Sequence, residues 1–153
     1  MRHYDKLIFV SESDTATSPM AEAILQRQFL LEDILIASKG LVVLFPEPIN
    51  PKVEAVLVSN GLSMKDHVSE PLLEEDFDER TLVLTMDSAQ KSRLLRSFEN
   101  PRNVFTLAEY IRADIEVKDP YGGPLSDYGK CFEDLKEQVD RLAGILMTED
   151  SVR

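Results

Sequence analysis

The fold of this chain is decided by residues 7–19, which read Leu7-Ile8-Phe9-Val10-Ser11-Glu12-Ser13-Asp14-Thr15-Ala16-Thr17-Ser18-Pro19. The four apolar residues at its start are typical of a strand buried on both faces. A largely polar stretch follows. Ser18-Pro19 is then expected to begin a helix, with Ser18 as the N-cap and Pro19 at the first helical position. Such a strand–turn–helix unit presents backbone N–H groups at the positive end of a helix, which suits an anion.

The alternation of strand and helix continues along the chain. Apolar runs predict further strands at residues 34–37, 81–85 and 104–106, and Ser38-Lys39-Gly40 is expected to close the first of these. Loops are expected at residues 41–49 and 119–124. Helices are predicted from Ser18 to about Phe29, from Asn50 to Asn60 with Gly61 as its stop, from Ser88 to Phe98 and from Ser126 to Met147, with one short helix in the acidic segment 70–79.

This order of elements predicts an α/β fold formed by a single domain over residues 1–153. Buried strands that alternate with helices indicate a parallel sheet covered by helices on both sides. Ligands of such folds bind beyond the carboxyl ends of the strands. The loops at Ser11, Ser38, Asp87 and Asp119 are therefore the candidate site.

The composition limits the classes of partner. Because the formal net charge is −11 at pH 7, neither nucleic acid nor an anionic membrane is an expected partner. A single cysteine, Cys131, excludes an intramolecular disulfide, and with only His3 and His67 besides it we expect no metal and no other cofactor. No apolar run approaches about 20 residues and the N-terminus lacks a secretory signal, so we expect a cytoplasmic protein.

The turn and its surroundings resemble the low-molecular-weight protein tyrosine phosphatases. In that family a Cys follows the strand, five residues separate it from Arg-Ser-Pro, and a helix begins there. Residues 7–10 and 18–23 match here, as do Ser38-Lys39-Gly40, Met86-Asp87 and the loop at Asp119-Pro120-Tyr121. The resemblance covers essentially the whole chain. It implies a three-layer sandwich in which a doubly wound four-stranded parallel sheet carries helices on both faces.

The chain departs from this family where the chemistry is performed. The resemblance places Ser11 at the nucleophilic Cys and Thr17 at the phosphate-binding Arg. A thiol at a helix N-terminus ionises readily, whereas a serine hydroxyl stays protonated and needs a general base, for which the sequence offers no evident candidate. Threonine also has no charge with which to grip two phosphate oxygens.

The resemblance assigns further roles around the loop. Two carboxylates, Glu12 and Asp14, would repel a phosphate dianion, at a cost of about 1 kcal/mol for charges about 4 Å apart in water and about 4 kcal/mol at an intermediate dielectric. A family network that supports the loop coincides with Asp14, Ser18, Ser38 and His67, with Asp14 in place of an Asn; alternatively, His67 is a solvent-facing loop residue. The phosphate- and substrate-binding positions are Glu12, Ser13, Asp14, Thr15, Ala16, Ser18 and Tyr121.

Several other residues have two interpretations. Asp119 coincides with the family's general acid, but an Asp-Pro pair also begins turns. Tyr121 and Phe45 coincide with aromatic walls of the substrate pocket, but they could instead pack within their loops. Asp87 is either a helix cap or a ligand. Cys131, on the apolar face of the last predicted helix, is expected to be buried as a small hydrophobic residue.

These observations predict a catalytically inactive member of the family whose partner is a phosphoprotein or a phosphate-like anion. One alternative is a residual phosphomonoester or phosphotyrosine hydrolase that uses Ser11, or a metal held by Glu12, Asp14 and Asp119, because carboxylates suit Mg²⁺. Another is an interaction or scaffold module, either a monomer or a weak homodimer formed through the exposed-looking Leu44-Phe45.

Overall fold

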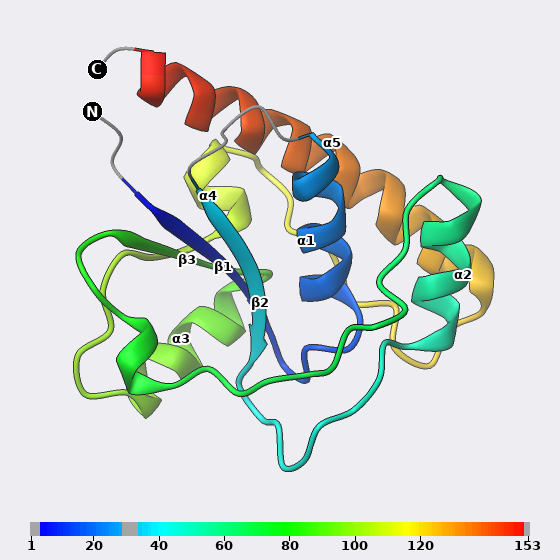
Figure 1. Ribbon diagram of the computed structural model, residues 1–153, viewed down its shortest axis with the longest axis horizontal. Helices are drawn as coiled ribbons and strands as arrows, with labels where there is room; N and C mark the ends of the chain where they lie inside the picture. The colour runs from blue at the N-terminus through cyan, green and yellow to red at the C-terminus, as the bar shows by residue number, and fades with distance from the viewer. Residues whose placement is uncertain (1–3, 29–33, 152–153) are drawn as a thin grey trace.

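The computed structural model describes residues 4–28 and 34–151, so His3 and Phe29 lie outside the described residues. Four strands form one parallel sheet in the order β2-β1-β3-β4 (Figure 1). This is the doubly wound arrangement that the resemblance implied. The strands are β1 (Lys6–Ser11), β2 (Leu35–Gly40), β3 (Thr81–Thr85) and β4 (Val104–Thr106).

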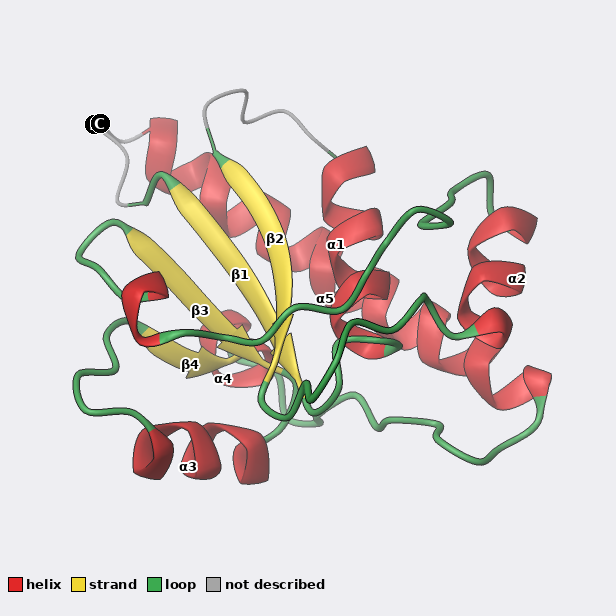
Figure 2. Ribbon diagram, turned by 60° about the horizontal axis from the view of Figure 1, so that its bottom comes forward, coloured by secondary structure: helices red, strands yellow, loops and turns green. Residues whose placement is uncertain are grey.

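Helices cover both faces of the sheet, as predicted (Figure 2). The α1 helix (Thr17–Arg27), the short α4 (Leu107–Ile111) and α5 (Leu125–Ser151) bury one face, and α2 (Pro51–Ser59) adds to the same core. The other face is buried by α3 (Ser88–Ser97) and by Leu72 and Phe77, which flank the 3₁₀ helix η1 (Glu74–Asp76). Because successive side chains of a strand point to opposite faces of the sheet, Phe9 of β1 packs in the first core and Ile8 packs in the second.

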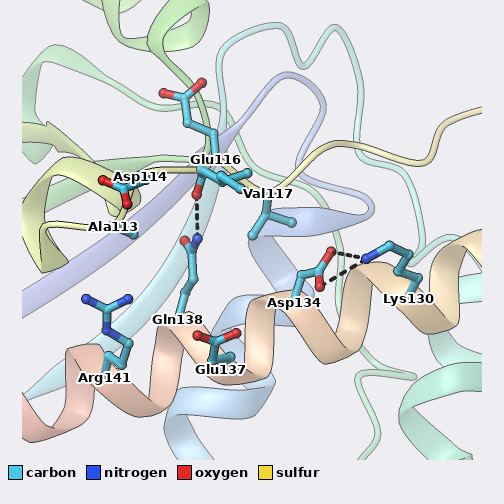
Figure 3. A pocket seen from close by; sticks show the side chains of 10 residues that line it. Ala113, Asp114, Glu116, Val117, Lys130, Asp134, Glu137, Gln138 and Arg141 are labelled. Atoms are coloured by element: carbon cyan, nitrogen blue, oxygen red, sulfur yellow. Dashed lines mark hydrogen bonds and ion pairs between the residues drawn. The ribbon is translucent and has the colours of Figure 1, made fainter.

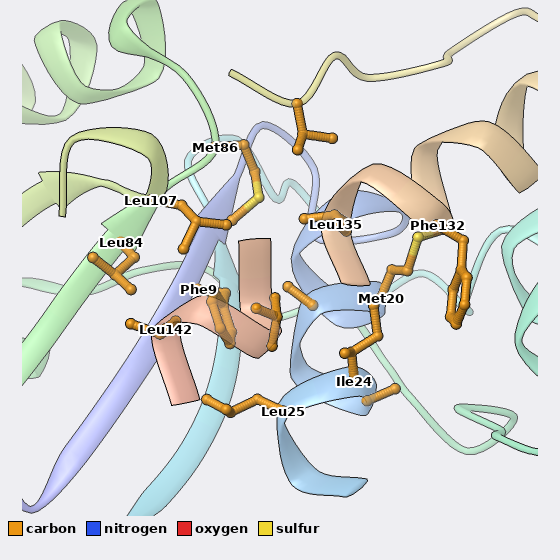
Figure 4. Packing of buried hydrophobic residues seen from close by; sticks show 14 of the residues in the cluster. Phe9, Met20, Ile24, Leu25, Leu84, Met86, Leu107, Phe132, Leu135 and Leu142 are labelled. Carbon is orange, nitrogen blue, oxygen red and sulfur yellow. The ribbon is translucent and has the colours of Figure 1, made fainter. Parts of the chain in front are cut away.

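The larger core positions the candidate loop, because it fixes β1, α1 and α5 relative to one another. Figure 4 shows Phe9 of β1, Met20 and Ile24 of α1, and Phe132 and Leu135 of α5 packed together, and all five are 2% exposed or less. The apolar face predicted for the last helix is confirmed, since these residues are all buried: Tyr128, Cys131, Leu135, Val139, Leu142 and Leu146.

Two predictions about strand and helix ends are wrong. β2 continues through Ser38 and Lys39 to Gly40, and it lies at the edge of the sheet, so that Leu35 is 69% exposed instead of buried on both faces. Ser18 is not the N-cap of α1, because the helix begins at Thr17 after Ala16, with no side-chain cap. The Ser18 hydroxyl is instead engaged by the loop described below.

Other local predictions are confirmed. The Asn50 side chain caps α2 by accepting from the amides of Lys52 and Val53, and Gly61 ends that helix with φ 77°. The α4 helix was not predicted from the sequence; it begins with a reciprocal cap between Thr106 and Glu109. No helix in the described part of the chain is both long enough and apolar enough to cross a membrane.

Candidate functional site

The candidate loop joins the carboxyl end of β1 to the N-terminus of α1, at the edge of the sheet where ligands bind parallel-sheet folds. Asp14 has a left-handed backbone conformation, with φ 59°. Asp tolerates this conformation better than most residues. A left-handed residue in a turn helps neighbouring amides to point into one concave surface. The end of β2 lies close beneath. A Cβ on Gly40 would lie 3.0 Å from the Ser13 carbonyl carbon and 3.1 Å from the Asp14 nitrogen, so a side chain there would press on the loop.

Ser11, Ser18 and Asp14 form a hydrogen-bonded chain inside the loop. The Ser11 and Ser18 Oγ atoms are 2.6 Å apart, and Ser18 Oγ donates to Asp14 Oδ1 at 2.8 Å. Since a serine hydroxyl has one proton, Ser11 donates to Ser18. The Asp14 amide in turn donates to Ser11 Oγ at 3.2 Å. All three residues are at most 3% exposed.

The Asp14 carboxylate is the centre of the loop-supporting network. Its Oδ2 accepts from the Glu70 amide at 3.1 Å and lies 3.5 Å from His67 Nε2, which is also 2.8 Å from the Asp14 carbonyl oxygen. Burial raises the pKa of the Asp14 carboxyl, opposed by the nearby hydroxyls of Ser38 and Ser18, by the Glu70 amide and by His67. The His67 side chain is only 8% exposed, so it is not a solvent-facing loop residue.

Ser38 lies in the same buried cluster, although its Oγ has no hydrogen bond of normal geometry within the described residues. Sequence reasoning missed Glu22 of α1, a further carboxyl there. Burial raises the pKa of the Glu22 carboxyl. The Ser38 hydroxyl and the charge of His67 oppose this rise, whereas the charge of Asp14 adds to it. Its spacing of four residues from Ser18, on one helix face, was the available signal.

Thr17, which the resemblance places at a phosphate-binding arginine, is the first residue of α1. It is 1% exposed, and no group in the described residues accepts or donates a hydrogen bond at its Oγ1. Buried hydroxyls are normally paired, and leaving one unpaired costs about 1–3 kcal/mol. Thr17 therefore brings an unused hydroxyl, and no charge, to the loop.

Three carboxyls gather at the mouth of the loop. Burial raises the pKa of the Asp119 carboxyl. A hydrogen bond from the Tyr121 amide opposes this rise, and the charges of Asp87 and Glu12 reinforce it. A raised pKa suits a proton donor. Asp119 is also a turn starter, because its Oδ1 accepts from the Tyr121 amide at 2.9 Å. Asp87 caps α3 by accepting from the Gln90 amide at 2.7 Å.

A cation that the sequence did not indicate also reaches the loop. Arg93 of α3 forms an ion pair with Glu12, 81 residues away in the chain. Both side chains are about half exposed. Because water screens the two charges, the ion pair contributes little to the stability of the fold. It nevertheless neutralises one of the two loop carboxylates.

The remaining predicted residues fall into two groups. Ser13 Oγ and Thr15 Oγ1 are 2.8 Å apart, so these hydroxyls pair with each other, and Ala16 is buried. Tyr121, Phe45 and Leu44 are exposed by 88%, 64% and 88%. The two aromatic side chains are thus not packed within their loops, and Leu44-Phe45 is exposed as expected.

The proposed metal site does not form in the part of the chain that the structure describes, where no group of three Asp, Glu, His or Cys side chains could hold an ion. Asp14 is directed to Ser18 and the Glu70 amide instead of Glu12 and Asp119. The metal-assisted alternative therefore lacks its predicted ligand set.

Two hollows lie near the site. One of about 350 Å³ between residues 113–117 and α5 contains none of the predicted site residues. Inside it, Gln138 Nε2 donates to the Ile115 carbonyl oxygen at 2.7 Å, and Lys130 forms an ion pair with Asp134 (Figure 3). The other, an open groove of about 830 Å³, includes Asp87 and Asp119 and is therefore continuous with the mouth. Glu109, Asp114 and Glu116 make it acidic.

Residues 6–152 match the low molecular weight phosphotyrosine protein phosphatase family. The chain belongs to that family. It is 31% identical over 146 residues to the protein-arginine-phosphatase of Geobacillus stearothermophilus, covering 94% of this chain and 97% of that protein.

Solved structures agree with this membership. The chain superposes on YwlE arginine phosphatase from Geobacillus stearothermophilus with a TM-score of 0.89, at 30% identity over 97% of this chain and 96% of that one. A cysteine-to-serine mutant of YwlE arginine phosphatase with a phosphorylated active-site serine gives a TM-score of 0.87, at 31% identity over 97% of this chain and 99% of that one. Both similarities support the α/β fold derived above.

Proposed function

We propose that this family member does not turn over phosphate esters and acts by binding a phosphorylated protein or a phosphate-like anion at its loop. The proposal rests on one observation: the loop contains a neutral Ser11, hydrogen-bonded to Ser18, and an uncharged Thr17, and so has neither a thiolate nor a cation at these two positions. Removing one donor that stabilises transition-state charge costs about 10²–10³ in kcat. The loss of both nucleophile and cation costs more, and their effects are not additive.

Binding is supported by what the loop retains. The positive end of α1 still lies at the loop, the Asp14–His67 network holds the backbone, and the Thr17 hydroxyl has no partner among the described residues. The carboxylates weaken this site for a dianion, although Arg93 offsets Glu12. We therefore expect weak binding of free phosphate.

The acidic groove favours a particular partner. Asp87, Glu109 and Glu116 line a surface next to the loop mouth, and a phosphorylated segment with neighbouring basic residues would complement it. Arginine- or tyrosine-phosphorylated proteins are the candidates, since the family and the relatives named above act on those groups.

Steady-state assays with para-nitrophenyl phosphate, a phosphotyrosine peptide and phosphoarginine test the proposal. We expect phosphate release at the rate of the buffer blank, together with saturable binding of the phosphopeptide by calorimetry. The unphosphorylated peptide is the matched control for binding. Turnover at enzymatic rates that disappears in Asp119→Asn would refute the proposal.

A further inference from the structure

The hydrogen bonds inside the loop supply what the sequence did not indicate, a base within reach of Ser11. Ser11 donates to Ser18 over 2.6 Å, and Ser18 donates to Asp14 over 2.8 Å. A nucleophile, a relay and a base held by further groups are the arrangement that activates hydroxyls in other enzymes. The Glu70 amide and His67 hold the carboxylate in place.

We propose that Ser11 is a phosphoryl acceptor that uses Asp14 as its base through Ser18, so that the protein captures one phosphoryl group and keeps it. The inference rests on the proposed function, because it needs a loop that admits a phosphoryl group without turning it over. The donor is a phosphoryl group on a good leaving group, such as an aryl phosphate or a phosphoguanidine.

The step balances with the residues of this chain. Ser11 Oγ attacks phosphorus and forms an O–P bond while the donor's P–O or P–N bond breaks, and the electron pair leaves with the aryl oxygen or guanidine nitrogen. The Ser11 proton passes to Ser18, and the Ser18 proton passes to the Asp14 carboxylate. Asp119, at the loop mouth, donates a proton to the leaving group.

The product resists hydrolysis for a chemical reason. To regenerate the protein, water would have to displace the serine oxygen. Even when Asp14 returns its proton through Ser18, that oxygen is a far poorer leaving group than an aryl oxygen or the thiolate of a cysteine with an ordinary pKa of about 8.5. Because Thr17 offers no charge to stabilise either transition state, the quality of the leaving group decides which of the two steps proceeds. A serine in this loop therefore converts a turnover cycle into a single capture.

The charged groups around Asp14 determine the expected pH profile. His67 from the loop before Glu70 and Glu22 from α1 face the carboxyl. Capture requires an ionised Asp14, so its rate rises as pH rises through the pKa of Asp14, which burial raises. Capture also requires a protonated Asp119, so the rate falls again as pH rises through the raised pKa of that residue. The profile is bell-shaped.

The test incubates the full chain with para-nitrophenyl phosphate and, in a separate arm, with phosphoarginine. We expect a release of para-nitrophenol that approaches one equivalent per chain and then stops, a gain in intact mass of one phosphoryl group, and its location at Ser11 by peptide mapping. Ser11→Ala should abolish the gain. Asp14→Asn and Ser18→Ala should each slow capture at least about tenfold, and Asp14→Asn should remove the acidic limb of the profile.

Ser69→Ala is the matched control, because it deletes another buried hydroxyl, one that accepts from the Glu47 amide at 2.9 Å outside the relay. It should capture at the wild-type rate, and thermal unfolding verifies that every variant folds. A chain that stays unmodified overturns the inference but leaves the proposed function standing. Capture at the wild-type rate in both Asp14→Asn and Ser18→Ala overturns the relay. Continuous phosphate release overturns the proposed function itself.

Discussion

His67 Nε2 lies 2.8 Å from the carbonyl oxygen of Asp14, and the two residues are 53 positions apart in the chain. This contact connects the segment before η1 to the loop after β1. Because Asp14 is fully buried and has a left-handed backbone, its carbonyl has no easy access to water. The shape of the loop therefore depends on a side chain contributed from a distant part of the sequence.

His67→Ala should lower the free energy of unfolding by about 1–3 kcal/mol, because it leaves the buried Asp14 carbonyl without a hydrogen bond. Urea unfolding measures the change. His67→Gln retains a side-chain N–H donor and should recover part of the loss. Equal stability of His67→Ala and the wild type would show that the contact contributes nothing.

Restoring Ser11→Cys together with Thr17→Arg should produce phosphatase activity toward para-nitrophenyl phosphate at least about 10³-fold above the unchanged protein. The reason is that the double change returns a thiolate and a guanidinium to a loop whose supporting network is intact. Each single change is the control and should recover much less. No recovery in the double variant would mean that Glu12 and Asp14 silence the loop independently.

Stability should increase as pH falls from neutrality through the raised pKa values of three buried carboxyls. The carboxyls of Asp14, Glu22 and Asp119 have raised pKa values in the folded protein, mainly through burial. Such groups bind protons more tightly when folded, so their stabilising contribution is present at low pH and is lost as pH rises through the folded pKa. Glu109, whose pKa is lowered by Lys91, acts in the opposite sense. Urea midpoints across this range check the trend, and Glu22→Gln should flatten it.

The Cys131 thiol should be unreactive in the folded protein. Burial raises its pKa to about 12, with smaller contributions from Asp119 and Asp134, so almost no thiolate is present at pH 8. A colorimetric disulfide reagent should react slowly with the native chain and stoichiometrically in urea. Rapid labelling without denaturant would contradict the burial.

Leu135→Ala should lower the free energy of unfolding by about 2–5 kcal/mol, because Leu135 is 0% exposed between α5 and the sheet and its removal leaves a cavity. Leu44→Ala is the matched control. Since Leu44 is 88% exposed, its loss should change stability by less than about 0.5 kcal/mol. Denaturant titrations of both variants make the comparison.

Sequence patterns predicted the fold well where local physics decides. The apolar runs at β1 and β3, the Asn50-Pro51 start of α2 and the apolar face of α5 all follow from burial periodicity and capping. The prediction failed for α4, a helix of five residues, too short for a periodic pattern. It also failed at β2, because an apolar run does not reveal that its strand lies at a sheet edge.

The order and type of the residues were enough to predict the α/β fold, and to predict that Ser11 and Thr17 stand where the family has its nucleophile and its cation. Only the tertiary structure placed Ser18 between Ser11 and Asp14, brought Arg93 to Glu12, and gathered Asp87 and Asp119 at one mouth. These relationships are set by how β1, α1 and α3 pack, and a hydrogen bond or charge contact depends on distances that no spacing in the chain specifies.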